Sequence, residues 1–336
     1  MLKKYLLYGM GCLLAFSACN KDDEEITTPS HVDRDWFVIQ DKPGELNQLI
    51  YKVYTDTRVP IFVNDTLGEE CYATDAQGNP IMRVETFNIR YSIFGDTLSS
   101  KDLQTRYAVN SADTTAMMYA VQTIRDKVIP YLAKAGEGRP KSFYLVDSIN
   151  DLKPLSRYSS ETGGYVQYYY PYSLAIHSAQ KGVVVGKLGE LKRMIEENDD
   201  EGVAMWAGRV LAAKVVEWIL GGGVNKDLLK AEWYNITTTG LKRETYEDWW
   251  PSGTAGYTRD LRPTGGLFGY KVDLEEIRVF PSQEQDLLEY VALVYVYRNR
   301  DTEFYANPYY DFDKVHRKYE GMKKYVEAFE ALYSVE

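Results

Sequence analysis

The segment from Arg209 to Gly223, RVLAAKVVEWILGGG, is apolar on almost every side of the helix that it would form. Only Lys214 and Glu217 carry a charge in its interior. A helix that is hydrophobic all round has to be buried by other elements. Gly221 is the expected C-terminal cap, because glycine takes the left-handed conformation without strain. A fold that holds this helix therefore needs further helices or strands packed around it.

The composition is that of a globular protein with a large core. The 336 residues suffice for one large domain or two modest ones, and 45% of them are apolar. The net charge of −10 argues against nucleic acid or an anionic membrane as the main partner. The 29 tyrosines favour a binding surface, since tyrosine gives rigid contact area at low entropic cost, although they also suit a β-rich core.

Residues 1–18 carry the pattern of a secretory signal peptide. Lys3 and Lys4 precede an apolar run from Tyr5 to Phe16, which is too short to span a bilayer. Two small residues then stand directly before Cys19, an arrangement that resembles the bacterial lipobox. The resemblance implies cleavage before Cys19 and attachment of lipid to its thiol and its new amine.

An acidic segment, NKDDEEITTPSH, follows Cys19. Its like charges repel one another and its polar residues cannot build a core, so residues 19–33 are expected to form a solvated tether. An acidic run beside a lipidated cysteine also resembles the surface-export signal of Bacteroidetes lipoproteins. This resemblance implies a lipid-anchored location at the cell surface, on the outer membrane, with one folded domain over residues 34–336.

Cys71 is the one cysteine that remains once Cys12 leaves with the signal and Cys19 is acylated. No intrachain disulfide is then expected. We expect Cys71 to be a small buried hydrophobic residue. A catalytic cysteine is not indicated, because such a residue needs a nearby base and the chain holds only three histidines.

Hydrophobic periodicity predicts helices and strands in the first part of the domain and helices at its end. Helical spacing indicates helices over residues 43–57, 114–136, 189–198, 201–220, 282–300 and 314–334. Short apolar or alternating runs indicate strands over residues 59–65, 84–94, 141–149, 164–178 and 181–188. Asp113 is a candidate N-cap, and Pro130 should kink or split its helix. This order of elements predicts an α+β fold.

The common catalytic fingerprints are absent from the sequence. No G-x-S-x-G nucleophile elbow, P-loop, dinucleotide-binding fingerprint or EF-hand loop occurs. Asp311, Asp313 and His316 could approach one another, but two aspartates before a helix are more often caps than metal ligands. The motifs therefore indicate neither a cofactor nor a metal.

The order of several segments resembles a known family of lipoproteins. The segments are IYKVYTDTRVPIFVNDTLG (50–68), VIPYLAKAG (128–136), SFYLVDSI (142–149), RVLAAKVVEWIL (209–220), EQDLLEYVALVY (284–295) and HRKYEGMKKYVEAF (316–329). Together they are similar to the zinc-binding metallopeptidase lipoproteins found beside SusC/SusD-type nutrient importers. The resemblance covers most of residues 35–334. It implies a single zincin-like domain with a small sheet and several helices.

That family carries H-E-x-x-H on the helix that corresponds to 209–220, with two histidines as zinc ligands and the glutamate as general base. The register that fits best places AKVVE, residues 213–217, on the motif. Ala213 and Glu217 then replace both ligands and Lys214 replaces the base. Asp286 and Glu289 match the acidic late helix of the family. The site is therefore expected to be degenerate, with Lys214 and Glu217 forming a local ion pair.

Our first hypothesis is an inactive metallopeptidase homologue that serves a nutrient importer as an accessory or binding component. The implied partners are a SusC-like TonB-dependent transporter, a SusD-like lipoprotein, and an oligopeptide or glycan ligand. Flat aromatic rings stack on sugars or hold peptide side chains, and adjacent tryptophans in a Gly-rich segment are hard to bury together. The candidate ligand-binding residues are Tyr168, Tyr169, Tyr170, Tyr172, Trp249, Trp250, Tyr257, Asp286 and Glu289.

Two other functions stay open at this stage. The first is an active hydrolase, which would hold zinc on another set of ligands or use Asp286 and Glu289 as a general acid and base. These two carboxylates lie three residues apart on a predicted helix and so share a face, as any such pair does. The second is a purely structural partner that braces a transporter and binds no substrate.

Overall fold

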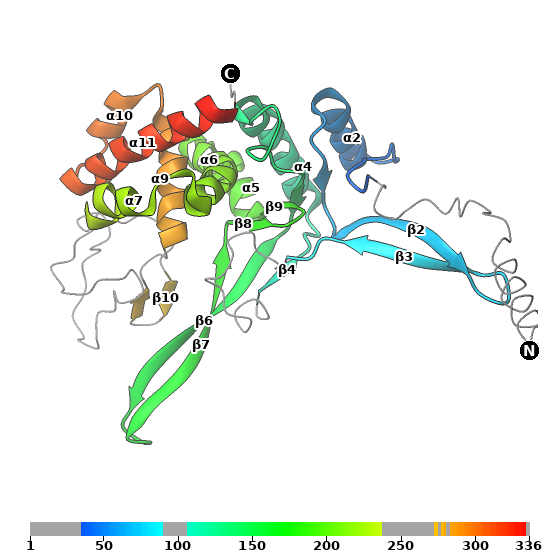
Figure 1. Ribbon diagram of the computed structural model, residues 1–336, viewed down its shortest axis with the longest axis horizontal. Coiled ribbons are helices and arrows are strands. Elements are labelled where there is room, and N and C mark those ends of the chain that lie inside the picture. The colour runs from blue at the N-terminus through cyan, green and yellow to red at the C-terminus, as the bar shows by residue number, and fades with distance from the viewer. Residues whose placement is uncertain (1–34, 90–105, 237–271, 275–276, 280–282, 334–336) are drawn as a thin grey trace, which may run out of the picture. The chain divides into compact units, whose positions relative to one another are not determined.

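The computed structural model describes residues 35–89, 106–236, 272–274, 277–279 and 283–333 (Figure 1). They form a mixed α+β structure that is about half helical and has small sheets, which confirms the predicted α+β class. The chain divides into two units, Met1–Trp36 and Phe37–Glu336, and every described helix and strand lies in the second. The predicted signal and tether lie outside the described residues. No helix in the described part of the chain is long and apolar enough to cross a membrane.

A four-stranded sheet lies at the centre of the first half of the structure. Its order is β1-β5-β9-β8, with bounds Ile61–Phe62, Phe143–Leu145, Gly182–Val185 and Ile176–Ala179. The first three strands are parallel, and β8 runs antiparallel to β9. Every residue of β5, β8 and β9 is buried, and β5 and β9 are the continuous apolar runs that strands covered on both faces require.

Helices cover this sheet and complete the first hydrophobic cluster. Its helical members come from α2 (Glu45–Thr57), α4 (Thr114–Thr123), α5 (Leu188–Glu196) and α6 (Asp200–Trp218). Asp113 caps α4 as predicted, since its carboxylate accepts a 3.0 Å hydrogen bond from the Ala116 amide. Asp199 caps α6 in the same way, at 2.8 Å from the Gly202 amide.

Helix α6 also belongs to a second hydrophobic cluster. There it packs with α7 (Lys226–Glu232), α9 (Gln283–Tyr297), α10 (Asp301–Ala306) and α11 (Asp313–Tyr333). A Cβ on Gly208 would lie only 2.9 Å from the Ala292 carbonyl oxygen, so glycine allows α6 and α9 to approach closely. Because α6 contributes to both clusters, the prediction that its apolar segment is buried on most sides is confirmed.

Two of the predicted helices, 114–136 and 201–220, continue into turns of a different kind. The 114–136 helix divides into α4, a π-turn (Ile124–Val128) and a 3-10 turn (Ile129–Tyr131), which confirms the expected break at Pro130. A π-turn over Ile219–Gly223 also extends α6. The left-handed residue after α6 is Gly222, with φ of 102°, so the cap predicted at Gly221 is one residue early. The wider turn takes up the additional residue.

Several predicted strands have different bounds. Residues 141–149 divide between β5 and β6 (Ser148–Ser159), and residues 164–178 divide between β7 (Gly164–Leu174) and β8. Strand β4 (Tyr107–Val109) joins β6 and β7 in a three-stranded sheet of order β4-β6-β7. A short pair, β10 (Val272–Leu274) and β11 (Ile277–Val279), precedes α9. The prediction missed α7 and α10, which are too short to show a clear period.

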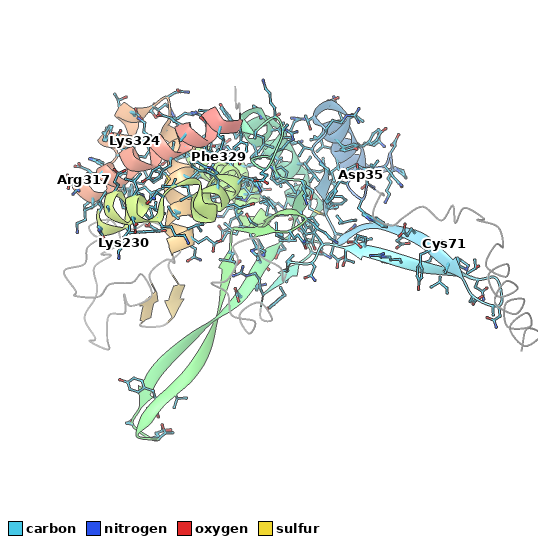
Figure 2. All side chains as sticks on the ribbon, in the orientation of Figure 1. Asp35, Cys71, Lys230, Arg317, Lys324 and Phe329 are labelled. Carbon is cyan, nitrogen blue, oxygen red and sulfur yellow. The ribbon has the colours of Figure 1, made fainter. Side chains whose placement is uncertain are left out.

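The strand predicted over 84–94 is confirmed only at residues 84–86, and residues 90–94 lie outside the described residues. Residues Thr66–Thr74 and Pro80–Thr86 form the hairpin β2–β3, and the prediction is wrong for the buried residues Phe87 and Ile89, which follow it outside any strand. Figure 2 shows Cys71 on this hairpin, and its side chain is exposed, so the prediction of a buried cysteine is also wrong. The reason is that β2 and β3 pair only with each other and form a sheet of two strands, most of whose residues are exposed.

Candidate functional site

Helix α6, on which the resemblance places the metal ligands, lies beside α9, which resembles the acidic late helix of that family, and an ion pair joins the two. The Arg209 guanidinium donates from Nε to Glu289 Oε1 at 2.7 Å and from Nη2 to Oε2 at 2.9 Å. Burial alone would lower the pKa of Arg209, but the charge and hydrogen bonds of Glu289 outweigh burial and raise it. The bidentate geometry is the strongest form of arginine–carboxylate contact, so it fixes both side chains.

Arg209 was not among the residues that the sequence singled out. It lies one helical turn before Ala213, and residues four apart on a helix share a face. The Glu289 carboxylate of α9 therefore pairs with a cation at position 209, whereas the sequence predicts the motif at residues 213–217. The signal in the sequence was an arginine at the start of an otherwise apolar helical face, which has to find a partner when it is buried.

The predicted motif residues are close together but do not form a metal site. Lys214 Nζ donates to Glu217 Oε1 at 2.8 Å, so the predicted local ion pair is confirmed. Ala213 is buried and has no atom that could bind a metal. The second carboxylate oxygen of Glu217 is buried and has no hydrogen-bond partner in the described structure. One carboxylate already neutralised by a lysine is a poor donor set for zinc, which prefers nitrogen and sulfur ligands.

Asp286 pairs with a different cation from Glu289. Its carboxylate binds the Lys318 ammonium of α11, and both side chains have an exposed fraction of 0%. The Lys318 Nζ atom also lies 3.7 Å from the centroid of the Trp233 ring and 4.6 Å from that of Tyr290. Burial lowers the pKa of Lys318 to about 8, and the Asp286 charge opposes this effect. Asp286 and Glu289 share one helix, but each is held by its own cation, so the geometry does not make them an acid–base pair.

A second buried polar cluster joins three residues that are far apart in the sequence. Arg106 donates from Nε to Asp151 Oδ2 at 2.8 Å, its Nη2 forms an ion pair with the same oxygen at 2.7 Å, and its Nη1 lies 3.0 Å from His177 Nδ1. Because a guanidinium only donates, Nδ1 of His177 accepts and Nε2 carries the proton. Nε2 then donates to the Ile89 carbonyl at 2.8 Å.

This polar cluster keeps its histidine neutral. Burial, and then the charge of Arg106, lowers the pKa of His177 to about 3. Glu284 at the start of α9 is close enough for Arg106 to act on it, although burial raises the pKa of Glu284 overall. No pattern in the sequence indicates this cluster, since its members come from separate strands and loops with no fixed spacing.

The predicted aromatic residues fall in two places. Tyr168, Tyr169, Tyr170 and Tyr172 lie on β7, where they pair with Leu155, Pro154, Lys153 and Asp151 of β6. Trp249, Trp250 and Tyr257 lie outside the described residues, as does Cys19. His316 contacts the Tyr305 ring at 4.9 Å between centroids, and Asp313 approaches Arg317 at 3.8 Å. Within the described ranges, no group of three or more His, Cys, Asp or Glu residues could hold a metal ion.

The candidate residues of the described structure therefore form ion pairs and polar clusters. The donor set on α6 and α9 does not fit zinc, because a guanidinium cannot coordinate a cation and Lys214 neutralises Glu217. No family model, no curated protein and no solved structure matches this chain.

Proposed function

We propose that the chain is a lipid-anchored protein of the outer-membrane surface that serves a SusC/SusD-type importer as a binding component. Its domain is a zincin-like metallopeptidase domain in which the metal site has been replaced. The ion pair between Arg209 of α6 and Glu289 of α9 carries this proposal. It joins the helix on which the resemblance places the metal ligands to the acidic late helix, and it puts a fixed positive charge beside Glu289.

In this proposal, the guanidinium supplies the positive charge that a metal ion would supply, but it cannot do the metal's chemistry. A carboxylate partly buried between two helices needs a positive partner, which a metal ion or a guanidinium can supply. The guanidinium satisfies Glu289 with two hydrogen bonds, but it cannot activate water as bound zinc does. The helix pair therefore keeps its packing and loses the group that hydrolysis would need.

Restoring histidines on α6 tests the assignment of this site. In a chain carrying both Arg209→His and Ala213→His, two imidazoles four residues apart would join Glu289, and two histidines with one glutamate are a zinc donor set. We expect about one zinc ion per chain, against none in the original protein, as measured by elemental mass spectrometry after dialysis.

The control variant carries Ala213→His and Glu217→His. Its two histidines are also four residues apart, but they occupy the positions that the sequence alone predicts for the motif. It should not gain zinc, because Glu289 contacts position 209. Zinc in the control but not in the test variant would show that the site lies one turn later. Zinc in neither would remove the support that α6 and α9 give to a metallopeptidase-like domain.

The membrane anchor and the partner are tested together in native cells. Tagged protein isolated from detergent-solubilised outer membranes is expected to carry fatty acid and to bring down a SusC/SusD-type pair, identified by mass spectrometry. Cys19→Ala should abolish both results, because the thiol that accepts lipid is gone. Cys12→Ala, within the predicted signal, is the matched control and should change neither. Isolation of the lipidated protein without any transporter would contradict the role in import.

A further inference from the structure

Strands β2 and β3 form a sheet of their own, and no third strand in the described part of the chain pairs with either of them (Figure 1). An isolated hairpin is marginally stable in water and needs a further strand, or a helix on its face, for independent stability. Most residues of this hairpin are exposed, and its exposed apolar side chains are Tyr72, Ile81, Met82 and Val84. The hairpin therefore has a surface that a further strand could complete.

The edge of β3 is regular, whereas the edge of β2 is not. Both irregularities of the ladder lie on β2, at Leu67 and Tyr72, and β3 pairs without a break from Pro80 to Thr86. Bulges are one of the ways in which proteins prevent an edge strand from pairing further. The edge that can accept another strand is therefore that of β3.

One hydrogen bond identifies the backbone groups on this edge. The Phe87 amide donates to the Asp65 carbonyl at 2.6 Å, directly beside the opposed residues Thr66 and Thr86. Thr86 is therefore in a non-hydrogen-bonded pair and directs its own N–H and C=O away from β2. The direction alternates along an antiparallel strand, so Val84 also directs its N–H and C=O to the open edge.

Two opposite charges flank Val84 on one face of β3. The Arg83 guanidinium approaches Glu85 Oε2 at only 3.7 Å, beyond hydrogen-bond range. Glu85 Oε1 pairs with Lys181, whose ammonium also donates to the Thr86 carbonyl at 2.6 Å. A carbonyl oxygen has two lone pairs, so Thr86 can accept a second bond. In the described structure, Arg83 and Glu85 Oε2 can therefore each take a closer partner.

The sequence of β3 around Val84, MRVET, is complementary to itself when two copies run antiparallel. With Val84 opposite the same residue of a second copy, Arg83 lies opposite Glu85, and Met82 lies opposite Thr86. The two valines then exchange two main-chain hydrogen bonds, and two pairs of opposite charge form. Moving the centre by one residue would instead oppose Arg83 to itself or Glu85 to itself, which is destabilising.

We propose that two copies of this chain associate through β3, in an antiparallel pair centred on Val84, to form a sheet of order β2-β3-β3-β2. A two-fold axis uses the same patch on both copies, so one sequence supplies both halves of the interface. The exposed Met82 and Val84 of both copies meet on one face of this sheet. The inference goes beyond the proposed function and does not depend on it, because it uses only the hairpin.

Oxidative cross-linking of the full-length protein in detergent tests the register. A cysteine at position 84 would have its Cα about 5.5 Å from that of its copy, within the range of a disulfide. We expect Val84→Cys combined with Cys71→Ser to form covalent dimers on treatment with copper–phenanthroline and oxygen. Cys71→Ser alone gives the background from Cys12 and Cys19. The original chain should not exceed this background, since Cys71 would lie three strand spacings, about 14 Å, from its copy.

Analytical ultracentrifugation measures the strength of the pair. Val84→Pro removes an N–H that bonds the second copy and not β2, so it should weaken dimerisation at least about tenfold. Arg83→Glu and Glu85→Arg should each weaken it as well, because like charges then face each other. An equimolar mixture of these two variants should recover dimers, since every Glu then faces an Arg. Circular dichroism verifies that each variant remains folded.

Several outcomes would overturn the inference. A monomer at every concentration, or cross-linking at position 84 no greater than the background, would leave the hairpin to a strand of another protein. A dimer that Val84→Pro does not weaken, or one that is cross-linked through Cys71, would place the interface elsewhere. Recovery of dimers in the mixture would support the proposed register, because loss of the contact between Glu85 and Lys181 within one chain cannot produce it.

Discussion

Replacing Lys318 by Met is expected to lower the free energy of unfolding by about 3–5 kcal/mol, because it leaves a buried carboxylate without its counter-charge. The partner, Asp286, has no exposed surface. The ammonium also lies against the faces of Trp233 and Tyr290, an arrangement that attracts a cation. Urea titration followed by circular dichroism measures the change as a shift of the midpoint at constant slope.

Two further variants make this result specific. Lys324→Met removes a lysine from an exposed position on the same helix (Figure 2) and should change stability by no more than about 0.5 kcal/mol. Lys318→Met combined with Asp286→Leu removes both charges and should recover most of the loss, since apolar pairs replace buried ion pairs with little cost. A loss below about 1 kcal/mol in Lys318→Met alone would mean that the pair is not buried as described.

His177 is expected to make the protein sensitive to acid. Its pKa is about 3 in the folded chain and 6.5 in an exposed imidazole. Below pH 6.5 the unfolded chain therefore takes up a proton that the folded chain does not. The titration of His177 does not change the free energy of unfolding above that pH. As the pH drops from 6.5 towards 3, it lowers the free energy of unfolding by up to about 1.4 kcal/mol per pH unit.

The measurement is the free energy of unfolding at several pH values, compared between the original chain and His177→Gln. The glutamine cannot titrate, so the difference between the two chains should shrink as the pH falls through this window. Parallel pH profiles for the original chain and His177→Gln would show that His177 is protonated in the folded protein.

Much of the fold was predictable because it follows local patterns. The apolar segment within α6 had to be buried, Asp113 could cap a helix, and Pro130 could not lie inside one. The bounds of strands were less predictable, because Phe87 and Ile89 alternate like strand residues yet are buried by packing alone. The exposure of Cys71 follows from a hairpin of two strands, which no local pattern indicates.

The candidate site was predictable only in part. The Lys214–Glu217 pair lies within one turn of helix, so spacing in the sequence is enough to find it. The partners of Arg209, Asp286 and His177 lie on other elements, and nothing in a single sequence fixes such pairings. The predicted register at residues 213–217 depends on the helix alone, whereas the contact of Arg209 with Glu289 depends on how α9 packs against α6.

One imidazole joins three separate parts of the chain. Nε2 of His177 donates to the Ile89 carbonyl, and Nδ1 of the same ring accepts from Arg106. Because both ring nitrogens are bonded, the ring cannot rotate without breaking a hydrogen bond, so a substitution at any one of these three residues should disturb the positions of the other two.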